Sequence, residues 1–299
     1  MKRFLIPLLS LSLAAPAGAV SIKHDLGTVD LPSTPKRVVV LEYAYADDVA
    51  ALGLKPVGWA READVPDYLG RQLAGVPSIG TRAQPSLEKI LALKPDLILA
   101  DTGRHKNIYA QLSKIAPTIS LNVFRSDYQG QLDALGTLGR ALGREPQAQR
   151  LLDEQARLLA KSRLLAKRGA GGLLVAALPP SNLFVLHSRE SVIGDLMGRL
   201  GRTNLSSSVG KEDSLYSLDL EGVAALNPAT LVLLVNPGEH NVLESWGKNP
   251  IWLRLRAVQS GKVFTFDRDL WSKARGIQAL SQITRQAVSS GLLQDQPKR

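Results

Sequence analysis

The fold is decided by residues 87–100, which have the sequence LEKILALKPDLILA. Residues 87–93 have the apolar spacing of a short amphipathic helix, and Gln84-Pro85-Ser86 before them is typical of a helix start. Lys94-Pro95-Asp96 interrupts the pattern, and the apolar run 97–100 then predicts a strand that is buried on both faces. We therefore expect a helix followed by a strand inside a parallel sheet.

The same alternation continues in both directions along the chain. The further predicted strands are residues 37–41, 55–59, 173–178 and 231–235, and the further predicted helices are 46–52 and 193–200. Continuous apolar strands separated by helices are typical of an α/β protein whose mainly parallel sheets are covered by helices on both faces.

A partial internal repeat indicates two similar lobes. Residues 220–228, LEGVAALNP, align with residues 87–95, LEKILALKP, and an apolar strand follows each copy. Chance, together with the general helix–proline–strand pattern, is the alternative explanation. We expect two Rossmann-like lobes.

A single long helix is expected to join the lobes. Residues 145–168 contain no helix breaker after Pro146, and Leu151, Leu158 and Leu165 recur every seven residues. About 24 helical residues would span roughly 36 Å, which is enough to run along two lobes and join them rigidly. The predicted organisation is an N-terminal lobe at 20–144, a backbone helix at 145–168 and a C-terminal lobe at 169–299. The ligand cleft is expected between the lobes.

The composition narrows the classes of function. The 299 residues include 37 Lys and Arg against 27 Asp and Glu, which gives a formal net charge of +10. The basic residues are spread along the chain and aromatics are only 5% of it, which argues against nucleic acid and is compatible with an anionic small ligand. The absence of cysteine excludes a cysteine nucleophile, a thiolate zinc site, an iron–sulfur cluster and a lipid anchor on an N-terminal cysteine.

The N-terminus predicts export. Residues 1–19 combine Lys2 and Arg3 with an apolar stretch at 4–15 and the small-residue sequence AGA at 17–19, which is typical of a cleaved Sec-type signal peptide. The apolar stretch is shorter than the roughly 20 residues that span a bilayer. We expect a periplasmic protein without a lipid anchor.

Several segments resemble a known family. IGTRAQPSLE at 79–88, ALKPDLI at 92–98, and RVVVLE at 37–42 are similar to the periplasmic siderophore-, haem- and cobalamin-binding proteins that deliver ligands to ABC importers. Within that family, GTRAQP at 80–85 and Arg104-His105 resemble the ferric dicitrate-binding members. Leu186-His187, Trp271 and Arg275-Gly276 follow in the same order, so the resemblance covers nearly the whole chain after residue 19.

The resemblance implies a binding protein and no enzyme. It implies ferric dicitrate, Fe(III) held by citrate oxygens, as the ligand, no cofactor and no direct metal ligand from the protein. It implies the permease subunits of an inner-membrane ABC importer as partners. The oligomeric state stays open, and a monomer is the default for a protein that must present both lobes to one transporter. In this family a glutamate at one position of each lobe pairs with arginines of those subunits, and Glu88 and Glu221 occupy these positions; stabilisation of a helix N-terminus is their other role.

Arginines are the natural partners of a ligand rich in carboxylates. The guanidinium group binds a carboxylate through two hydrogen bonds and stays charged at every relevant pH. The candidates lie near predicted strand ends or helix starts and are Arg82, Arg104, Arg189, Lys273 and Arg275. Surface charge is the alternative for each. Lys273 departs from the family pattern, which has arginine there, and loses the two-bonded grip.

Four further residues are candidates with structural alternatives. Tyr43 and Tyr45 could donate hydroxyl hydrogen bonds to citrate or pack in the core, and Trp271 could line the cleft or the core. His105 could donate to the ligand, or it could be a surface or helix-capping histidine. The four histidines are isolated in sequence, which argues against a direct zinc or manganese site.

Two alternatives stay open at this point. Another ferric chelate, a siderophore or haem would keep the same fold, although haem needs an apolar pocket with a Tyr or His ligand. An enzyme acting on an anionic substrate is a remote alternative, because fold does not determine function, but the sequence contains no recognisable nucleophile–base pair.

Overall fold

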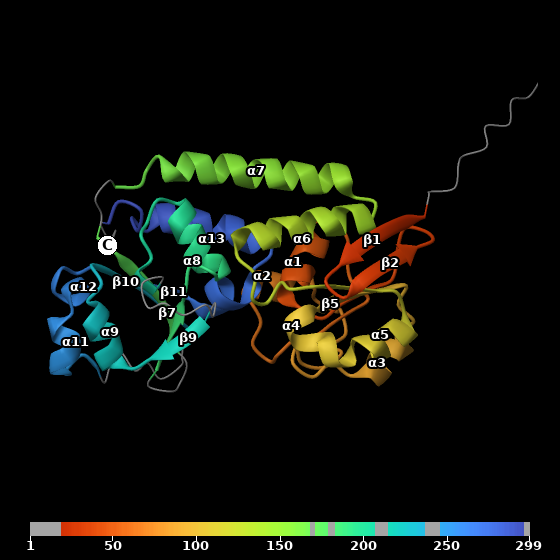
Figure 1. Cartoon of the computed structure of the whole chain (residues 1–299), viewed down its shortest axis with the longest axis horizontal. Coiled ribbons are helices and arrows are strands. Elements are labelled where there is room, and N and C mark those ends of the chain that lie inside the picture. The colour runs from red at the N-terminus through yellow and green to blue at the C-terminus, as the bar shows by residue number, and fades with distance from the viewer. Residues whose placement is uncertain (1–18, 168–170, 179–182, 207–214, 237–245, 296–299) are drawn as a thin grey trace, which may run out of the picture.

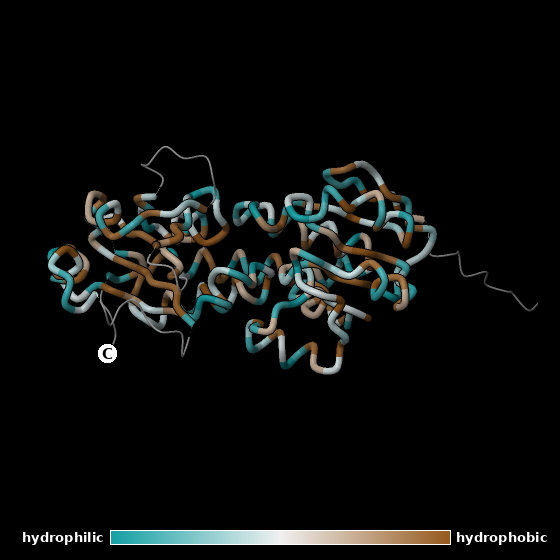
Figure 2. Tube along the Cα trace, turned by 90° about the horizontal axis from the view of Figure 1, so that it is seen from below, coloured by the Kyte–Doolittle hydropathy of each residue, from teal (hydrophilic) through white to brown (hydrophobic). Residues whose placement is uncertain are grey.

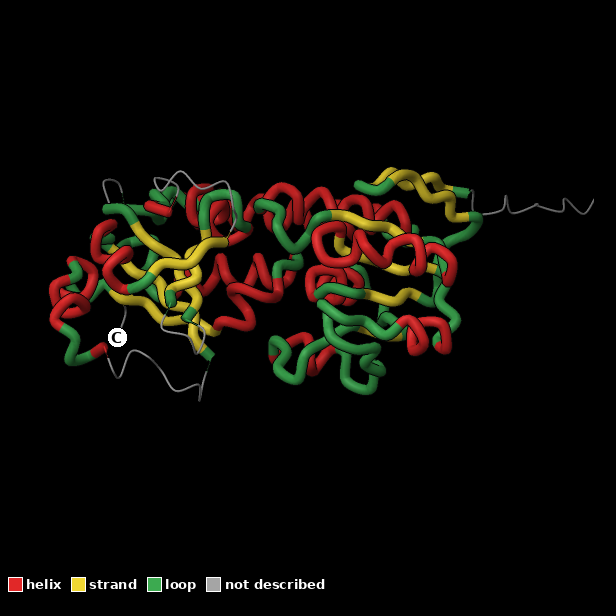
Figure 3. The backbone as a smooth tube through the Cα atoms, turned by 60° about the horizontal axis from the view of Figure 1, so that its bottom comes forward, coloured by secondary structure: helices red, strands yellow, loops and turns green. Residues whose placement is uncertain are grey.

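The computed structural model describes residues 19–167, 171–178, 183–206, 215–236 and 246–295. All but the last residue of the predicted signal peptide lie outside the described residues. The described chain forms two α/β lobes, each around its own sheet (Figure 3). Within these residues, no helix combines the length and the apolar character needed to cross a bilayer.

The first lobe contains a four-stranded parallel sheet in the order β4-β3-β5-β6, with an antiparallel hairpin, β1-β2, beside it. Its strands are β1 (Val20–His24), β2 (Gly27–Leu31), β3 (Val38–Val40), β4 (Gly58–Trp59), β5 (Leu97–Asp101) and β6 (Thr118–Leu121). Its helices are α1 (Tyr43–Ala51), α2 (Asp67–Gln72), α3 (Leu87–Ala92), α4 (Thr102–His105), η1 (Lys106–Ile108), α5 (Tyr109–Ile115) and α6 (Tyr128–Ala141).

The second lobe contains a five-stranded mixed sheet in the order β11-β10-β7-β8-β9. Strands β7, β10 and β11 are parallel, whereas β8 and β9 pair in antiparallel fashion. The elements are β7 (Leu173–Ala177), β8 (Phe184–His187), α8 (Val192–Arg199), β9 (Leu215–Leu218), α9 (Leu220–Leu226), β10 (Thr230–Val235), α11 (Pro250–Arg254), α12 (Arg256–Gln259), β11 (Val263–Asp267), the π-helical turn η3 (Asp269–Ala274) and α13 (Ile277–Ser289). The predicted two-lobed α/β fold with mainly parallel sheets is confirmed.

Both sheets are buried on both faces, as the continuous apolar strands predict. In β3, Val38 and Val40 join one hydrophobic core, whereas Val39 joins another core on the opposite face. In β7, Leu173 and Val175 likewise face away from Leu174. Successive side chains of a strand point to opposite faces, so each lobe has two cores with its sheet between them. Figure 2 shows the hydrophobic segments of the chain inside both lobes.

The two aligned sequence segments occupy equivalent places. Helix α3 precedes β5, which pairs in parallel with β3, the first strand of its sheet; helix α9 precedes β10, which pairs in parallel with β7, the first strand of the other sheet. This shared topology fits two similar lobes.

Helix α7 (Glu145–Arg163) runs along both lobes (Figure 1). It ends at Arg163, before the predicted boundary at 168. Its fully buried positions are Ala148, Gln155 and Ser162 rather than the predicted heptad leucines. These smaller or polar side chains face the neighbouring helices, and Gln155 accepts a hydrogen bond of 2.7 Å from Ser281 of α13.

Helix α13 is a second connection between the lobes, because it packs against α7, α1 and α6. Two buried carboxylates of α1 receive its first backbone N–H groups. Asp48 accepts from Ile277, and Asp47 accepts from Gln278 and Ala279, each at 2.9 Å. Negative charge at a helix N-terminus is stabilising.

Candidate functional site

Three of the predicted arginines converge around Glu42, which lies two residues after the end of β3. The Nε atom of Arg104 lies 2.7 Å from Oε1 of Glu42, and a terminal nitrogen of Arg82 lies 3.5 Å from Oε2. Arg275 comes from the turn between η3 and α13 and is close enough to interact electrostatically with all three residues. The cluster therefore combines the first lobe with the segment that leads into α13.

A tight turn positions Arg82. The backbone N–H of Gln84 donates to the carbonyl and to the hydroxyl oxygen of Thr81, at 3.2 and 3.0 Å. Gly80 has a φ of +109°, and a Cβ there would stand 2.6 Å from the carbonyl oxygen of Gln84, so only glycine fits the turn. The Arg82 guanidinium lies 4.1 Å from the ring centroid of Tyr43 and donates to Glu62 at 2.8 Å.

A capped helical turn positions Arg104. Asp101, at the end of β5, accepts from the backbone N–H of Arg104 at 2.8 Å through one oxygen. Its other oxygen accepts from the N–H groups of Val123 and Phe124, at 2.9 and 2.8 Å. The Arg104 guanidinium lies 3.6 Å from the ring centroid of Phe124. One buried carboxylate thus fixes both the arginine and the ring beneath it.

His105 links the two arginine segments and is itself buried. Its Nδ1 accepts from the N–H of Asp101 at 2.9 Å, so Nε2 carries the proton and donates to the carbonyl oxygen of Arg82 at 2.7 Å. Burial lowers its pKa below the usual value, which favours this neutral form. The geometry therefore gives His105 a positioning role, in which its ring holds the Arg82 segment against the start of α4.

Arg275 has an unusual backbone and an unpaired charge. Its φ of +65° is left-handed, which is uncommon outside glycine and is typical of functional sites. Its side chain is buried and lies 4.9 Å from the ring centroid of Phe124, so the two cations Arg104 and Arg275 share one aromatic ring. Among the described residues, no carboxylate forms an ion pair with Arg275.

The electrostatics of the cluster follow from burial. Burial raises the pKa of Glu42 to about 6, against the opposing effect of Arg82 and Arg104. Burial, together with the neighbouring arginines, lowers the pKa of Arg275 to about 10. Arg275 still carries its charge at neutral pH. Three guanidiniums therefore share this site with the carboxylates of Glu42 and Glu62, and within the described part of the chain Arg275 is the one of the three that has no carboxylate at ion-pair distance.

His187 extends the cluster into the second lobe. It lies at the end of β8, and burial, with Arg275 nearby, lowers its pKa to about 3. One of its ring nitrogens lies 3.2 Å from the hydroxyl of Ser272 in η3. His187 is therefore a neutral polar group in this corner of the site.

The other five predicted residues have polar partners within the protein. Arg189 is exposed and pairs with its neighbour Glu190, and Lys273 pairs with Asp269 within η3. Trp271 is fully buried and donates to Gln286, so the core alternative describes its place. The hydroxyl of Tyr45 donates to the carbonyl of Ala100, and that of Tyr43 donates to Glu62, so both tyrosines are committed to protein partners.

Glu88 and Glu221 are both exposed in the first turn of equivalent helices. Ser86 caps α3 through the N–H of Lys89, and Asp219 caps α9 through the N–H of Gly222. The caps leave both glutamate side chains available to a partner.

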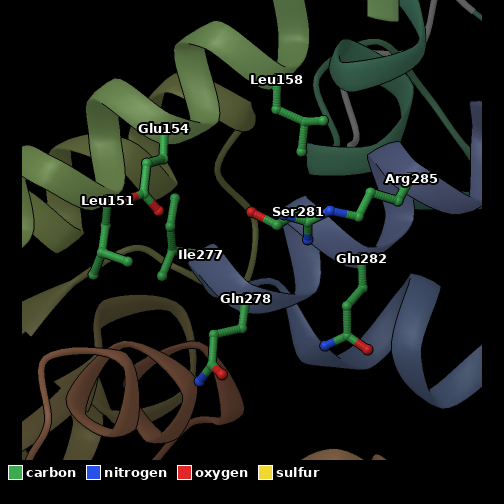
Figure 4. A pocket seen from close by; sticks show the side chains of 8 residues that line it. All are labelled: Leu151, Glu154, Leu158, Ile277, Gln278, Ser281, Gln282 and Arg285. Atoms are coloured by element: carbon green, nitrogen blue, oxygen red, sulfur yellow. The ribbon is translucent and has the colours of Figure 1, made fainter.

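Two further features concern possible ligands. In the described part of the chain, no group of three His, Cys, Asp or Glu residues is placed to hold a metal ion. A pocket of about 220 Å³ lies between α7 and α13 (Figure 4), and it contains none of the predicted site residues. Its lining residues are Leu151, Glu154, Leu158, Ile277, Gln278, Ser281, Gln282 and Arg285.

Sequence reasoning did not single out Glu42, Glu62 or Phe124 as site residues. Each follows the carboxyl end of a strand of the parallel sheet, β3, β4 and β6 respectively. Open α/β sheets bind ligands at that edge, so a charged or aromatic residue there was the available signal.

Known proteins resemble this chain over most of its length. A family model described as periplasmic binding protein matches residues 38–270. The Fe(3+)-citrate-binding protein YfmC of Bacillus subtilis is 35% identical over 260 residues, 86% of this chain and 81% of that protein. The Fe(3+) dicitrate-binding periplasmic protein FecB of Escherichia coli is 34% identical over 275 residues, covering 91% and 90%. The crystal structure of Staphylococcus aureus SirA complexed with staphyloferrin B has a TM-score of 0.80 and 27% identity, covering 90% and 97%.

Proposed function

This chain belongs to the periplasmic binding protein family, and from that premise we propose that it captures ferric citrate and delivers it to an ABC importer. The names of YfmC and FecB, which are 35% and 34% identical to this chain, support this ligand. The proposal includes no catalytic step.

The observation that carries the proposal is the unpaired cation of Arg275 beside Arg82 and Arg104. A buried charge is costly unless it meets an opposite charge. In ferric citrate the oxygens of citrate hold the iron, and the complex presents carboxylates on its outside. Such carboxylates supply a partner for Arg275 and can form paired, charge-assisted hydrogen bonds with the neighbouring guanidiniums. The protein then needs no metal ligand of its own.

The other candidates have subordinate roles in this proposal. Arg189 and Lys273 reach the ligand from the second lobe after leaving Glu190 and Asp269, and His105 holds the Arg82 segment in place. The aromatic and tyrosine candidates, Trp271, Tyr43 and Tyr45, act by packing around the site.

The remaining elements of the proposal concern delivery. The signal peptide at 1–19 is cleaved, and the mature protein is a periplasmic monomer without a lipid anchor. The lobes comprise residues 20–144 and 169–299, joined by the segment 145–168. Glu88 and Glu221, one on each lobe, contact arginines of the importer's permease subunits.

Calorimetric titration of the mature protein tests the ligand. Ferric citrate is compared with citrate alone, ferric nitrilotriacetate and haemin. We expect saturable binding that strongly favours ferric citrate. Selective binding of another chelate would keep the transport role and change the ligand, and no binding by any chelate would contradict the proposal.

A further inference from the structure

Glu42 is a buried carboxylate placed against the same guanidiniums that the proposed function assigns to the ligand. Its residue is only 2% exposed and caps the start of α1 by position, without a side-chain hydrogen bond to that helix. Its two oxygens point to Arg104 and Arg82. A negative charge in this place opposes the binding of an anion, so its presence requires an explanation.

The contacts of Glu42 are electrostatic rather than well-formed hydrogen bonds. The contact with Arg104 is short, at 2.7 Å, but is not aligned as a hydrogen bond, and the contact with Arg82 is long, at 3.5 Å. Asp101, beside it, differs sharply, because its oxygens accept three backbone N–H groups at 2.8 to 2.9 Å. Backbone hydrogen bonds thus fix the Asp101 carboxylate, whereas the Glu42 carboxylate is held by the charge of the neighbouring arginines.

We propose that Glu42 is a built-in counter-ion, whose carboxylate neutralises Arg82 and Arg104 without ligand and gives them up when carboxylates of the ligand bind. This inference rests on the proposed function and deepens it. Glu42 keeps the buried cations compensated in the free protein, and it reduces the positive charge that the arginine cluster offers to a ligand. It thereby sets the ligand charge that the cluster accepts.

If the ligand displaces Glu42 from the arginines, the protonation of Glu42 should change. The ionisable groups that surround it are Arg82 and Glu62 from the loops after β4, Asp101 and Arg104 from β5 and α4, Arg275 from the turn before α13, and Tyr43 and Tyr45 of α1. The pKa of Glu42 is already raised to about 6. Loss of the arginines to an anionic ligand raises that pKa further, so binding near pH 7 takes up a proton at Glu42.

The first experiment compares the mature protein with Glu42→Gln and with the matched control Glu154→Gln, which removes one exposed charge of α7 far along the chain from the arginine cluster. Calorimetry measures the affinity for ferric citrate and for the less charged ferric nitrilotriacetate. We expect Glu42→Gln to bind ferric citrate about tenfold more tightly, with a smaller gain for ferric nitrilotriacetate. Glu154→Gln should match the wild type.

The second experiment counts protons by titrating at pH 7 in two buffers of different ionisation enthalpy. The wild type should take up more protons on binding than Glu42→Gln, by up to about one. If Glu42→Gln does not fold, the wild-type count decides alone, and no uptake between about pH 6.5 and 7.5 overturns the proposal.

The outcomes separate the two proposals. If the wild type binds ferric citrate but Glu42→Gln gains no affinity and shows the same proton count, Glu42 is structural and the proposed function stands. If the wild type binds a different anionic chelate, the proposed ligand is wrong, and the same comparison with that chelate tests Glu42. If no anionic chelate binds, both proposals fail.

Discussion

Gly276 lies so close to Asp47 that a Cβ atom on the glycine would stand 2.4 Å from the Cβ of the aspartate. We therefore expect Gly276→Ala to push the start of α13 away from α1 and to weaken the hydrogen bonds that Asp47 accepts. The expected cost is about 2 to 4 kcal/mol of unfolding free energy, measured by urea denaturation. Gly198→Ala in α8 is the control, because a Cβ there meets nothing within 4 Å. Equal effects of the two variants would contradict the close-contact argument.

His105→Ala tests the link between the arginine segments. The substitution leaves the N–H of Asp101 and the carbonyl of Arg82 without their partner, so we expect a loss of about 2 to 4 kcal/mol in stability. Because the Arg82 turn loses its support, affinity for ferric citrate should fall about tenfold. The control is His24→Ala in the β1-β2 hairpin, which should reduce stability and leave the affinity of the folded protein unchanged. A normal affinity in His105→Ala would exclude the positioning role.

The buried His187 makes stability sensitive to acid. Its imidazole binds a proton below about pH 6.5 in the unfolded chain but only near pH 3 in the folded protein, so stability falls as the pH drops between these values. At pH 4.5 this effect of His187 lowers the free energy of unfolding by about 2 to 3 kcal/mol relative to pH 7. Glu42 and Asp47, whose pKa values are raised to about 6, act in the opposite direction between pH 6 and 4.5.

A comparison with His187→Gln isolates the imidazole from these carboxylates. Urea denaturation at pH 7.5, 6 and 4.5 should show that the stability difference between wild type and variant shrinks as the pH falls. Parallel curves would mean that His187 is not the group that titrates.

Arg104→Gln tests the cationic cluster. The side chain keeps its approximate length but loses its charge and its paired donors, so we expect affinity for ferric citrate to fall about 100-fold. Arg150→Gln on the exposed face of α7 is the control and should change affinity less than twofold. The measurement is the calorimetric titration, and a similar effect of both variants would indicate a general charge effect rather than a site.

Glu88→Ala combined with Glu221→Ala tests docking to the importer. Both side chains are exposed, so the double variant should fold and bind ferric citrate normally. We expect it to lose most of the ligand-stimulated ATPase activity of the reconstituted transporter. The control is Glu145→Ala with Glu154→Ala, two exposed residues of α7. Unchanged ATPase activity in the double variant Glu88→Ala, Glu221→Ala would refute the docking assignment.

Much of the fold could be predicted because the strands are buried on both faces. Residues 97–100 and 173–178 are apolar at every position, and the structure places successive side chains in opposite cores. The buried face of α7 was harder to predict, because the spacing of its leucines does not show which residues pack closely against the neighbouring helices. The residues buried against the neighbouring helices are Ala148, Gln155 and Ser162, and side chains this small or polar do not stand out as an apolar stripe in the sequence.

The site could be predicted only in part, because the sequence does not show which charged residues form ion pairs with each other. Arg82 and Arg104 stand in distinctive turns near strand ends, which their sequence neighbours reveal. Arg189 and Lys273 look similar in sequence, but each finds a carboxylate within a few residues of itself. Glu42 depends on contacts with residues 40 and 62 positions away, and such long-range pairing leaves no local pattern.

The attachment of α13 to α1 has a consequence for the order in which the polypeptide acquires its structure. The hydrogen bond between Ile277 and Asp48 joins residues that are 229 positions apart. During synthesis, Asp47 and Asp48 leave the ribosome long before their helix partner exists. The first lobe therefore waits for nearly the whole chain before its packing is complete, and contacts of such high sequence separation slow folding.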